Sequence, residues 1–324
     1  MYQVENRLSK GHELLAERKP LTGFLNAIKG HFMLMRPVQL IWLDVFLGFA
    51  TYAVIVQQVP TWHFLLFILC SLLSDAGACT LNDIGDVTSD RLSTESSRKD
   101  RPMVTGTVGK RAAMVQAVLL YSAGLLLALY LGGYVFIFAL ALVIISHQYS
   151  MGPLKMNGRP IISQLFWVGF ALLYYSAASA YMIKYESVPW ENILNGLYFL
   201  AVMVLFVGLA ETLAKDLRDL DNDRDSGKKT TSVFIGPAKA AAVSFGLSTV
   251  GISLWAYPYF NVYDTPWHLR IPILVVVLSW IGISLFLCGS IFKGYTKSRA
   301  RQLHIGYLLT LTAILTLTYL GGVS

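Results

Sequence analysis

Nine apolar runs of membrane-spanning length dominate this sequence of 324 residues. A helix needs about 20 apolar residues to cross a bilayer core of about 30 Å. The chain is 55% hydrophobic and 14% charged, which is far more apolar than a soluble domain of this size. We therefore predict an all-α, polytopic membrane bundle of nine transmembrane helices. The predicted spans are residues 37 to 59, 61 to 81, 111 to 131, 132 to 149, 161 to 183, 193 to 214, 237 to 258, 269 to 292 and 301 to 320.

The positive charges are distributed unevenly between the two ends of these spans. If residue 1 is cytoplasmic, 24 of the 26 lysines and arginines lie on that side, and only Lys184 and Arg270 lie opposite. This follows the positive-inside rule. The formal charge of +7 then reflects membrane topology, so we expect a lipid bilayer and no nucleic acid as partner. The three cysteines lie inside apolar runs, which argues against a disulfide framework or a zinc site.

The N-terminal segment, residues 1–36, differs from the rest of the chain. Its first 20 residues are polar and lack the apolar core of a signal peptide. From Leu21 to Arg36, apolar residues recur at helical spacing among basic ones, which predicts an amphipathic helix at the cytoplasmic interface. A lid or a docking arm is the alternative. Residues 37–324 form a single transmembrane domain in this interpretation, and Arg36 is either an interfacial anchor or a ligand of an anionic substrate.

Two aspartate clusters follow the second and the sixth apolar runs, on the predicted cytoplasmic side. In each cluster, three aspartates are separated by steps of three and then four residues, which on a helix places them within an arc of about 60°. Crowded carboxylates repel one another and need a positive partner, and their oxygens are hard ligands that suit Mg²⁺. Two such clusters suggest metal ions facing one anion. The six aspartates are Asp83, Asp86, Asp90, Asp216, Asp219 and Asp223.

Basic residues follow the first cluster within twenty positions. A solvated loop with loosely paired charges would explain them, but Asp83 and Asp86 directly continue an apolar run, where ionisable groups usually face a cavity or the bundle interior. Metal-binding carboxylates beside arginines and lysines form a coherent diphosphate site. The last three spans carry almost no charge, which indicates that they complete the bundle while the chemistry lies in the first two-thirds of the chain.

Four motifs in the sequence resemble those of the UbiA-type superfamily of intramembrane prenyltransferases. The resemblance covers residues 35 to 320 and includes the span count. The motifs are Asn82-Asp83-x-x-Asp86-x-x-x-Asp90, Arg101-Pro102-x-x-x-Gly106, Tyr149-Ser150-x-x-Pro153-Leu154-Lys155 and Asp216-x-x-Asp219-x-x-x-Asp223-x-x-x-Gly227-x-x-Thr230.

This resemblance implies a helical bundle around a central cavity, with Mg²⁺ held by the two aspartate clusters and bound to an isoprenyl diphosphate. Ionisation of the C–O bond would leave an allylic cation, which a small acceptor captures. The aspartates would be both metal ligands and catalytic residues. The substrate-binding residues implied by the resemblance and by the nearby charges are Asn82, Arg91, Lys99, Arg101, Tyr149, Lys155 and Lys215.

The sequence departs from the family pattern in two places. The spacing from Asp90 to Arg101 is longer than in many members, and Glu211-Thr212 stands where many members have an arginine-glutamate pair. Both departures leave the acceptor open. A prenyltransferase with a small acceptor, such as an aromatic ring carbon, is the first hypothesis, and a terpene cyclase that needs no acceptor is the second. A cation transporter is the third, although transporters usually hold their ion ligands near the bilayer midplane.

Overall fold

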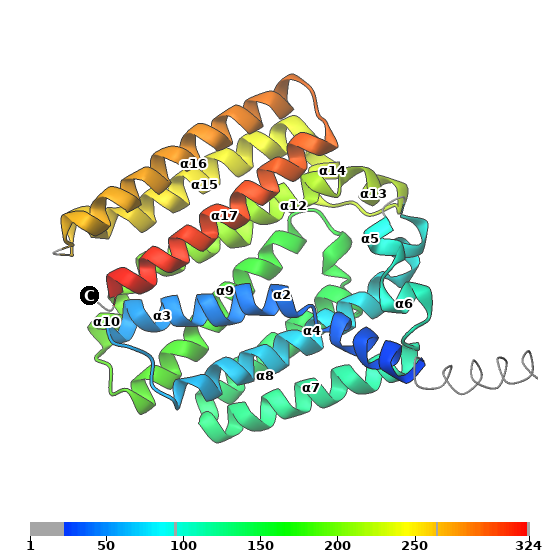
Figure 1. Ribbon diagram of the computed structural model, residues 1–324, viewed down its shortest axis with the longest axis horizontal. Coiled ribbons are helices and arrows are strands. Elements are labelled where there is room, and N and C mark those ends of the chain that lie inside the picture. Colours follow the sequence, from blue (N-terminus) through cyan, green and yellow to red (C-terminus); the bar gives the residue numbers. More distant parts are fainter. Residues whose placement is uncertain (1–22, 94–95, 264, 323–324) are drawn as a thin grey trace, which may run out of the picture.

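The computed structural model describes residues 23–93, 96–263 and 265–322, and it is built from helices (Figure 1). Within these residues, nine helices are long and apolar enough to cross a membrane, as predicted, and no strand is present. Several of the nine are divided into shorter consecutive elements. The elements are α2 (Pro37–Leu40), η1 (Ile41–Phe46), α3 (Leu47–Val56), α4 (Phe64–Leu92), α5 (Ser96–Lys99), α6 (Pro102–Thr105), α7 (Lys110–Leu131), α8 (Gly133–Ser150), η2 (Met156–Gly158), α9 (Ile162–Tyr185), α10 (Trp190–Asn195), α11 (Leu197–Val202), η3 (Met203–Glu211), α12 (Thr212–Arg218), α13 (Leu220–Asp225), α14 (Thr231–Ile235), α15 (Pro237–Asn261), α16 (Trp267–Lys293) and α17 (Lys297–Gly322).

The spans pack side by side in chain order and close into a ring. α4 packs on α7, α7 on α8 and α8 on α9, and the sixth to ninth spans continue through η3, α15, α16 and α17. α17 then packs against α3, so the last span meets the first (Figure 1). Because the ring closes, the cytoplasmic ends predicted for the second and sixth spans can approach each other.

Small residues let neighbouring helices approach closely where α4 meets its partners. A Cβ atom on Gly124 of α7 would lie 2.6 Å from the Ser74 hydroxyl of α4. A Cβ atom on Gly85, inside the first aspartate motif, would lie 2.6 Å from the Ser150 carbonyl oxygen at the end of α8. Such contacts are how helices associate in membranes, where packing replaces the hydrophobic effect. Gly85 therefore brings the end of α8 against the first motif.

The N-terminal helix is separate from the first span. Residues 23–34 are helical, and the backbone turns at Arg36, whose φ of 52° is left-handed, before α2 begins at Pro37. The helix exposes Phe24, Leu25, Ile28 and Phe32. An exposed apolar face is consistent with an interfacial helix. Its position in a membrane stays a prediction, and residues 1–22 lie outside the described residues.

The helix that carries the first aspartate cluster is longer than predicted. The sequence indicated a span ending at residue 81, but α4 continues to Leu92 and ends where Ser93 turns extended. The whole cluster is therefore on one helix, in the predicted register. The second cluster is not: α12 ends at Arg218, Asp219 has non-helical dihedral angles (φ −93°, ψ 3°), and α13 begins at Leu220. Asp and Asn are poor helix formers, which explains why the helix breaks in this segment.

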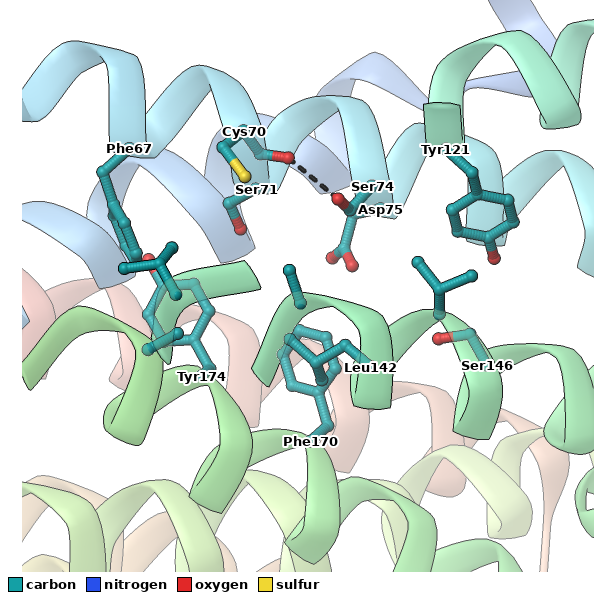
Figure 2. A pocket seen from close by; sticks show the side chains of 14 residues that line it. Phe67, Cys70, Ser71, Ser74, Asp75, Tyr121, Leu142, Ser146, Phe170 and Tyr174 are labelled. Carbon is teal, nitrogen blue, oxygen red and sulfur yellow. Dashed lines mark hydrogen bonds between the residues drawn. The ribbon is translucent and has the colours of Figure 1, made fainter. Parts of the chain in front are cut away.

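A cavity lies between α4, α7, α8 and α9 (Figure 2), and its α4 lining, from Phe67 to Asp75, precedes the first aspartate cluster on that helix. The space open to the centre of a water-sized group is about 30 Å³. Phe67, Leu142 and Phe170 contribute apolar wall, whereas Asp75 and Tyr121 direct polar groups into the cavity. The bundle thus encloses a partly polar space among its apolar side chains.

Candidate active site

The three aspartates of the first cluster are buried at the end of α4. Asp83, Asp86 and Asp90 are 4%, 9% and 1% exposed. Buried carboxylates need compensating positive charge or hydrogen bonds. The surrounding basic side chains supply both.

Two arginines bind the outer side of this cluster. Arg36, at the break before α2, forms an ion pair with Asp83. The Nη1 atom of Arg101 lies 2.6 Å from Asp90 Oδ2 and 3.4 Å from Asp83 Oδ1. Arg101 directly precedes Pro102, the first residue of α6, so this short helix fixes its position. Of the two alternatives for Arg36, the contact with Asp83 favours a role in the site.

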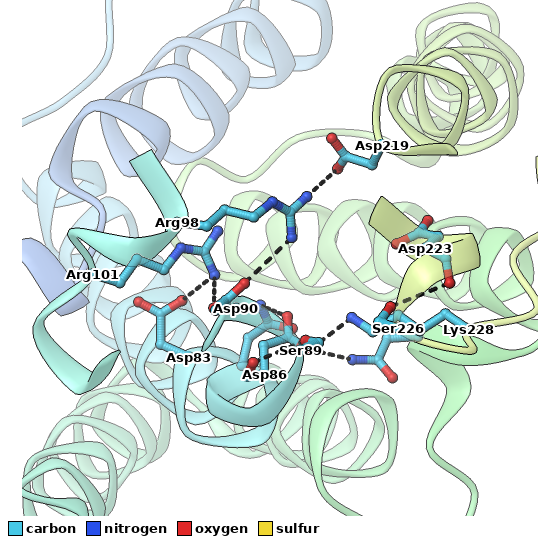
Figure 3. A network of polar contacts seen from close by, with 12 residues as sticks. Asp83, Asp86, Ser89, Asp90, Arg98, Arg101, Asp219, Asp223, Ser226 and Lys228 are labelled. Atoms are coloured by element: carbon cyan, nitrogen blue, oxygen red, sulfur yellow. Dashed lines mark hydrogen bonds and ion pairs between the residues drawn. The ribbon is translucent and has the colours of Figure 1, made fainter. Parts of the chain in front are cut away.

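Two further basic residues join the first cluster to the second (Figure 3). Arg98 of α5 lies between them, with Nη1 3.4 Å from Asp90 Oδ1 and Nη2 3.0 Å from Asp219 Oδ2. Lys228 follows the second cluster, and its Nζ lies 2.9 Å from Asp86 Oδ1. The residue before it, Gly227, has a φ of 73°, which favours glycine and explains the glycine of the motif. The two clusters therefore form one charged centre.

Two amide side chains donate hydrogen bonds to Asp86, one from α4 and one from the loop after α8. Asn82 donates to Asp86 Oδ2 at 3.2 Å, and Asn157 of η2 donates to Asp86 Oδ1 at 3.4 Å. Ser150, at the end of α8, donates to Asn82 Oδ1 at 3.5 Å. These bonds fix the orientation of the carboxylate through residues of three separate segments.

Asp216 is held by a chain of polar residues from α9 and α14. Gln164 donates to Asp216 Oδ2 at 2.9 Å, and Thr231 donates to Gln164 Oε1 at 2.5 Å. Both Gln164 and Thr231 are buried. This chain places the first carboxylate of the second cluster against the fifth span.

Asp219 and Asp223 differ in charge environment. Burial alone would raise the pKa of Asp219, but the two hydrogen bonds from Arg218, each 2.8 Å long, and the charge of Arg98 hold it well below the usual range. For Asp223, burial and the nearby charge of Asp219 outweigh the attraction of Lys228 and raise the pKa to about 6. Asp219 is thus ionised at neutral pH, whereas the pKa of Asp223 lies closer to neutrality, at about 6.

Arg218 belongs to a chain of hydrogen bonds that includes His304 of the last span. Arg218 Nη1 lies 3.3 Å from His304 Nδ1, and His304 Nε2 lies 2.8 Å from Glu211 Oε1. Because an arginine only donates, His304 accepts through Nδ1 and donates through Nε2, a tautomer assigned from the network. Glu211 ends the π-helix η3, a type of irregularity often found at functional sites. The ninth span therefore takes part in the site, which the sequence interpretation assigned to the first two-thirds of the chain.

Aromatic rings lie beside the second cluster. Tyr149 stacks on Phe166, with ring centroids 4.2 Å apart, and Lys215 Nζ lies 5.5 Å from the centre of the Trp167 ring. Tyr149 and Lys215 were both predicted as substrate-binding residues. Both lie beside the second aspartate cluster, and their role in substrate binding stays a prediction.

The residues predicted from sequence do not all reach the charged centre. The six aspartates with Asn82, Arg101, Tyr149 and Lys215 lie in or beside it. In contrast, the side chains of Arg91, Lys99 and Lys155 are exposed, and within the described part of the chain none forms an ion pair with the six aspartates. Their role in binding stays a prediction. Sequence reasoning missed Arg98, Asn157, Gln164, Lys228 and His304.

The donor chemistry of the site suits a hard divalent cation and a diphosphate. Among the described residues, no three acidic, histidine or cysteine side chains converge as a ready-made metal site. Instead, arginine and lysine side chains lie between the carboxylates. The carboxylates offer oxygen ligands of the kind Mg²⁺ prefers. Arginine and lysine side chains bind phosphate oxygens. The residues present therefore fit both a magnesium ion and a diphosphate.

Comparison with known proteins agrees with this geometry. Residues 44–304 match the model of the UbiA prenyltransferase family. The chain is 30% identical to a digeranylgeranylglyceryl phosphate synthase of Pyrococcus abyssi over 69% of this chain and 76% of the relative. A synthase of the same name from Methanoregula boonei is 27% identical over 72% and 77%. A solved UbiA homologue from Archaeoglobus fulgidus, bound to GPP and Mg²⁺, has the same fold, with a TM-score of 0.61 and 21% identity over 89% of this chain and 99% of that one.

Proposed function

The chain belongs to the UbiA prenyltransferase family, as an integral multi-pass membrane enzyme, and we propose that it transfers an isoprenyl group from an isoprenyl diphosphate to the hydroxyl of a glyceryl phosphate acceptor in a Mg²⁺-dependent reaction. The observation that carries the proposal is the joining of the two aspartate clusters by Arg98 and Lys228. A diphosphate with its metal ions needs such an arrangement of carboxylates and cations.

The metal would be held by Asp83, Asp86 and Asp90 on one side and by Asp216, Asp219 and Asp223 on the other. When bound, Mg²⁺ acts as a Lewis acid that stabilises negative charge on the diphosphate. Homologues of this fold bound to Mg²⁺ with GPP or DMAPP support this part of the proposal. We also propose that both clusters face the cytoplasm, which the distribution of lysine and arginine supports.

The basic side chains of the site would act on the leaving group. Four basic side chains pair with aspartates in this structure: Arg36, Arg98, Arg101 and Lys228. Once metal ions neutralise the carboxylates, these side chains would be available to donate to phosphate oxygens. They would stabilise the negative charge that develops on the diphosphate as the C–O bond breaks. The apolar bundle below the site limits access of water to the allylic cation.

The acceptor is the finer part of the proposal. The name of the relatives indicates a glyceryl phosphate product, and this supports an acceptor of the glycerol phosphate type over a small aromatic ring. The two departures from the family motifs, near Asp90 and at Glu211, lie beside the charged centre and are the natural places for a difference in acceptor.

The test is turnover by purified protein in lipid nanodiscs, with geranylgeranyl diphosphate, Mg²⁺ and a glyceryl phosphate lipid that carries a free hydroxyl. We expect an ether product and one pyrophosphate per product. Asp83→Ala and Asp219→Ala should each abolish turnover and leave the protein folded, because these charges serve the bound metal. Asp100→Asn, an exposed position between α5 and α6, is the control.

Three outcomes would contradict the proposal. Pyrophosphate release with a cyclic terpene and no acceptor would indicate a terpene cyclase. Ion flux in liposomes without turnover of prenyl diphosphate would indicate a transporter. Full activity of both aspartate variants would remove the two clusters from the site.

A further inference from the structure

Two aspartates inside the membrane spans take no part in the charged centre. Asp44 lies in the π-helix η1 and is 1% exposed, and Ser71 of α4 donates a hydrogen bond to its Oδ1. Its Oδ2 atom has no hydrogen-bond partner among the described residues. Asp75 lies one turn after Ser71 on α4 and lines the cavity. Ionisable residues at this depth are costly, so their presence points to a function.

The cavity presents its polar groups on one side. The carboxylate of Asp75 projects into the space, and the Tyr121 hydroxyl is directed to the same region (Figure 2). Tyr121 is 8% exposed, and its hydroxyl has no hydrogen-bond partner within the described part of the chain. A space of about 30 Å³ exceeds the roughly 10 to 15 Å³ that one water molecule needs. The cavity therefore has room and hydrogen-bonding groups for a small polar group such as a hydroxyl.

The cavity lies under the charged centre, on the same helix faces. On α4, Asp75 precedes Asp86 by three turns and Asn82 by two, so each of these two side chains falls within about 20° of Asp75 around the helix axis. On α8, Ser146 lines the cavity one turn before Ser150, which binds Asn82. On α9, Phe170 lines the cavity one turn after Phe166, which stacks on Tyr149. Three helices therefore contribute residues to both the site and the cavity.

We propose that Asp75 is the proton acceptor of the transfer reaction: its carboxylate takes the proton of the acceptor hydroxyl as that oxygen bonds to the allylic carbon. This inference rests on the proposed function. The carbon–oxygen bond to the diphosphate breaks, and its electron pair leaves with the diphosphate. A lone pair of the acceptor oxygen forms the new carbon–oxygen bond, the O–H electron pair stays on that oxygen, and the proton passes to Asp75.

The distance along α4 between Asp75 and the first aspartate cluster fits a role for Asp75 in accepting a proton while the cluster holds the diphosphate. Eight residues from Asp75 to Asp83 correspond to about 12 Å of helix. At this distance Asp75 is not among the residues that would hold the diphosphate and its metal ions. Tyr121 is a positioning residue in this arrangement, because its hydroxyl can donate to or accept from the same acceptor oxygen.

The experiment separates breaking of the diphosphate bond from capture of the cation. The probe is geranyl diphosphate with ¹⁸O at the oxygen that joins carbon to phosphorus. The acceptor is water in one arm of the experiment and a glyceryl phosphate lipid in the other. Movement of the label to a non-bridging position reports bond breaking and return, whereas pyrophosphate release reports capture. For Asp75→Asn we expect release to fall about 100-fold or more, as for loss of a general base, while label movement persists.

The control is Glu191→Gln, the same change from acid to amide at an exposed position in α10. Asp75→Ser is the second variant, and thermal unfolding in nanodiscs shows that the variants are folded. Two results would overturn the assignment of Asp75. One is pyrophosphate release at the wild-type rate by both Asp75→Asn and Asp75→Ser, and the other is an equal loss of label movement and pyrophosphate release. Absence of both signals in the wild-type protein would instead contradict the proposed function.

Discussion

The ammonium group of Lys228 lies 2.9 Å from the carboxylate of Asp86, although 142 residues separate them in the chain. The contact joins the segment after the second aspartate motif to the middle of the first. It brings a positive side chain against the first aspartate cluster, where we propose that the diphosphate binds. This relationship makes the two motifs a single site and gives the first prediction.

Replacing Lys228 by methionine should weaken binding of the isoprenyl diphosphate. A hydrogen bond to a charged group contributes about 1.5 to 3 kcal/mol, so we expect the KM for the diphosphate to rise roughly 10- to 100-fold, with a smaller effect on kcat. Steady-state kinetics with varied diphosphate measures this. Lys229→Met, at the exposed neighbouring position, is the control. An unchanged KM in the Lys228 variant would remove it from the diphosphate site.

Arg98 should be the most sensitive residue of the loop between α4 and α7. It contacts Asp90 and Asp219 at once, so Arg98→Ala removes one of the two arginines that pair with each carboxylate and loosens the link between the motifs. We expect kcat/KM to fall about 100-fold, and Arg98→Lys to restore only part of it, because lysine lacks the forked donors. Lys99→Ala, measured alongside, tests the sequence prediction for the exposed neighbour. Equal effects of the two alanine variants would contradict the bridging role of Arg98.

Affinity for Mg²⁺ should depend on pH through Asp223. Its pKa is raised to about 6, and a metal ion binds the ionised carboxylate and displaces the proton. As pH falls below about 6, the affinity should therefore drop by up to about tenfold per pH unit. Asp219, with its pKa held low by Arg218, contributes no such step in this range. Calorimetric titration between pH 5 and 8 measures the effect. Asp223→Asn should remove the step near pH 6, and a flat wild-type profile would be inconsistent with this assignment.

The first aspartate motif could be predicted in detail because it depends on local geometry. Steps of three and four residues define one face of a helix, and α4 continues through the motif without a break. The second motif has the same spacing, but Asp219 interrupts its helix. The break follows from the poor helix propensity of Asp and Asn in this segment, which the spacing of the aspartates does not reveal. The ion pair of Asp219 with Arg98 is a long-range contact and leaves no mark on local spacing either.

The partners of the aspartates were harder to predict. Arg98 and Lys228 stand among other basic residues of similar type, and only the folded chain shows which of them turn inward. Gln164 lies at the start of an apolar span with nothing in its neighbourhood to distinguish it. Asp44 and Asp75 did carry a signal, because an aspartate within an apolar run is rare and usually functional. Asp75 lines the cavity, so its position in the sequence marks one of the helices that surround the cavity.

His304 gives the last prediction, since it connects the ninth span to the second motif. It lies between Arg218 and Glu211, and Arg218 in turn holds Asp219 through two hydrogen bonds. Loss of residues that orient metal ligands typically costs 10- to 100-fold in metal affinity or activity. For His304→Ala we expect roughly a tenfold increase in the Mg²⁺ concentration that gives half-maximal activity. His304→Gln should recover part of the loss, because an amide can both donate and accept. The control is His268→Ala, at an exposed position in α16. If His304→Ala keeps the wild-type Mg²⁺ dependence, α17 contributes only to packing, as the scarcity of charge in the last three spans first indicated.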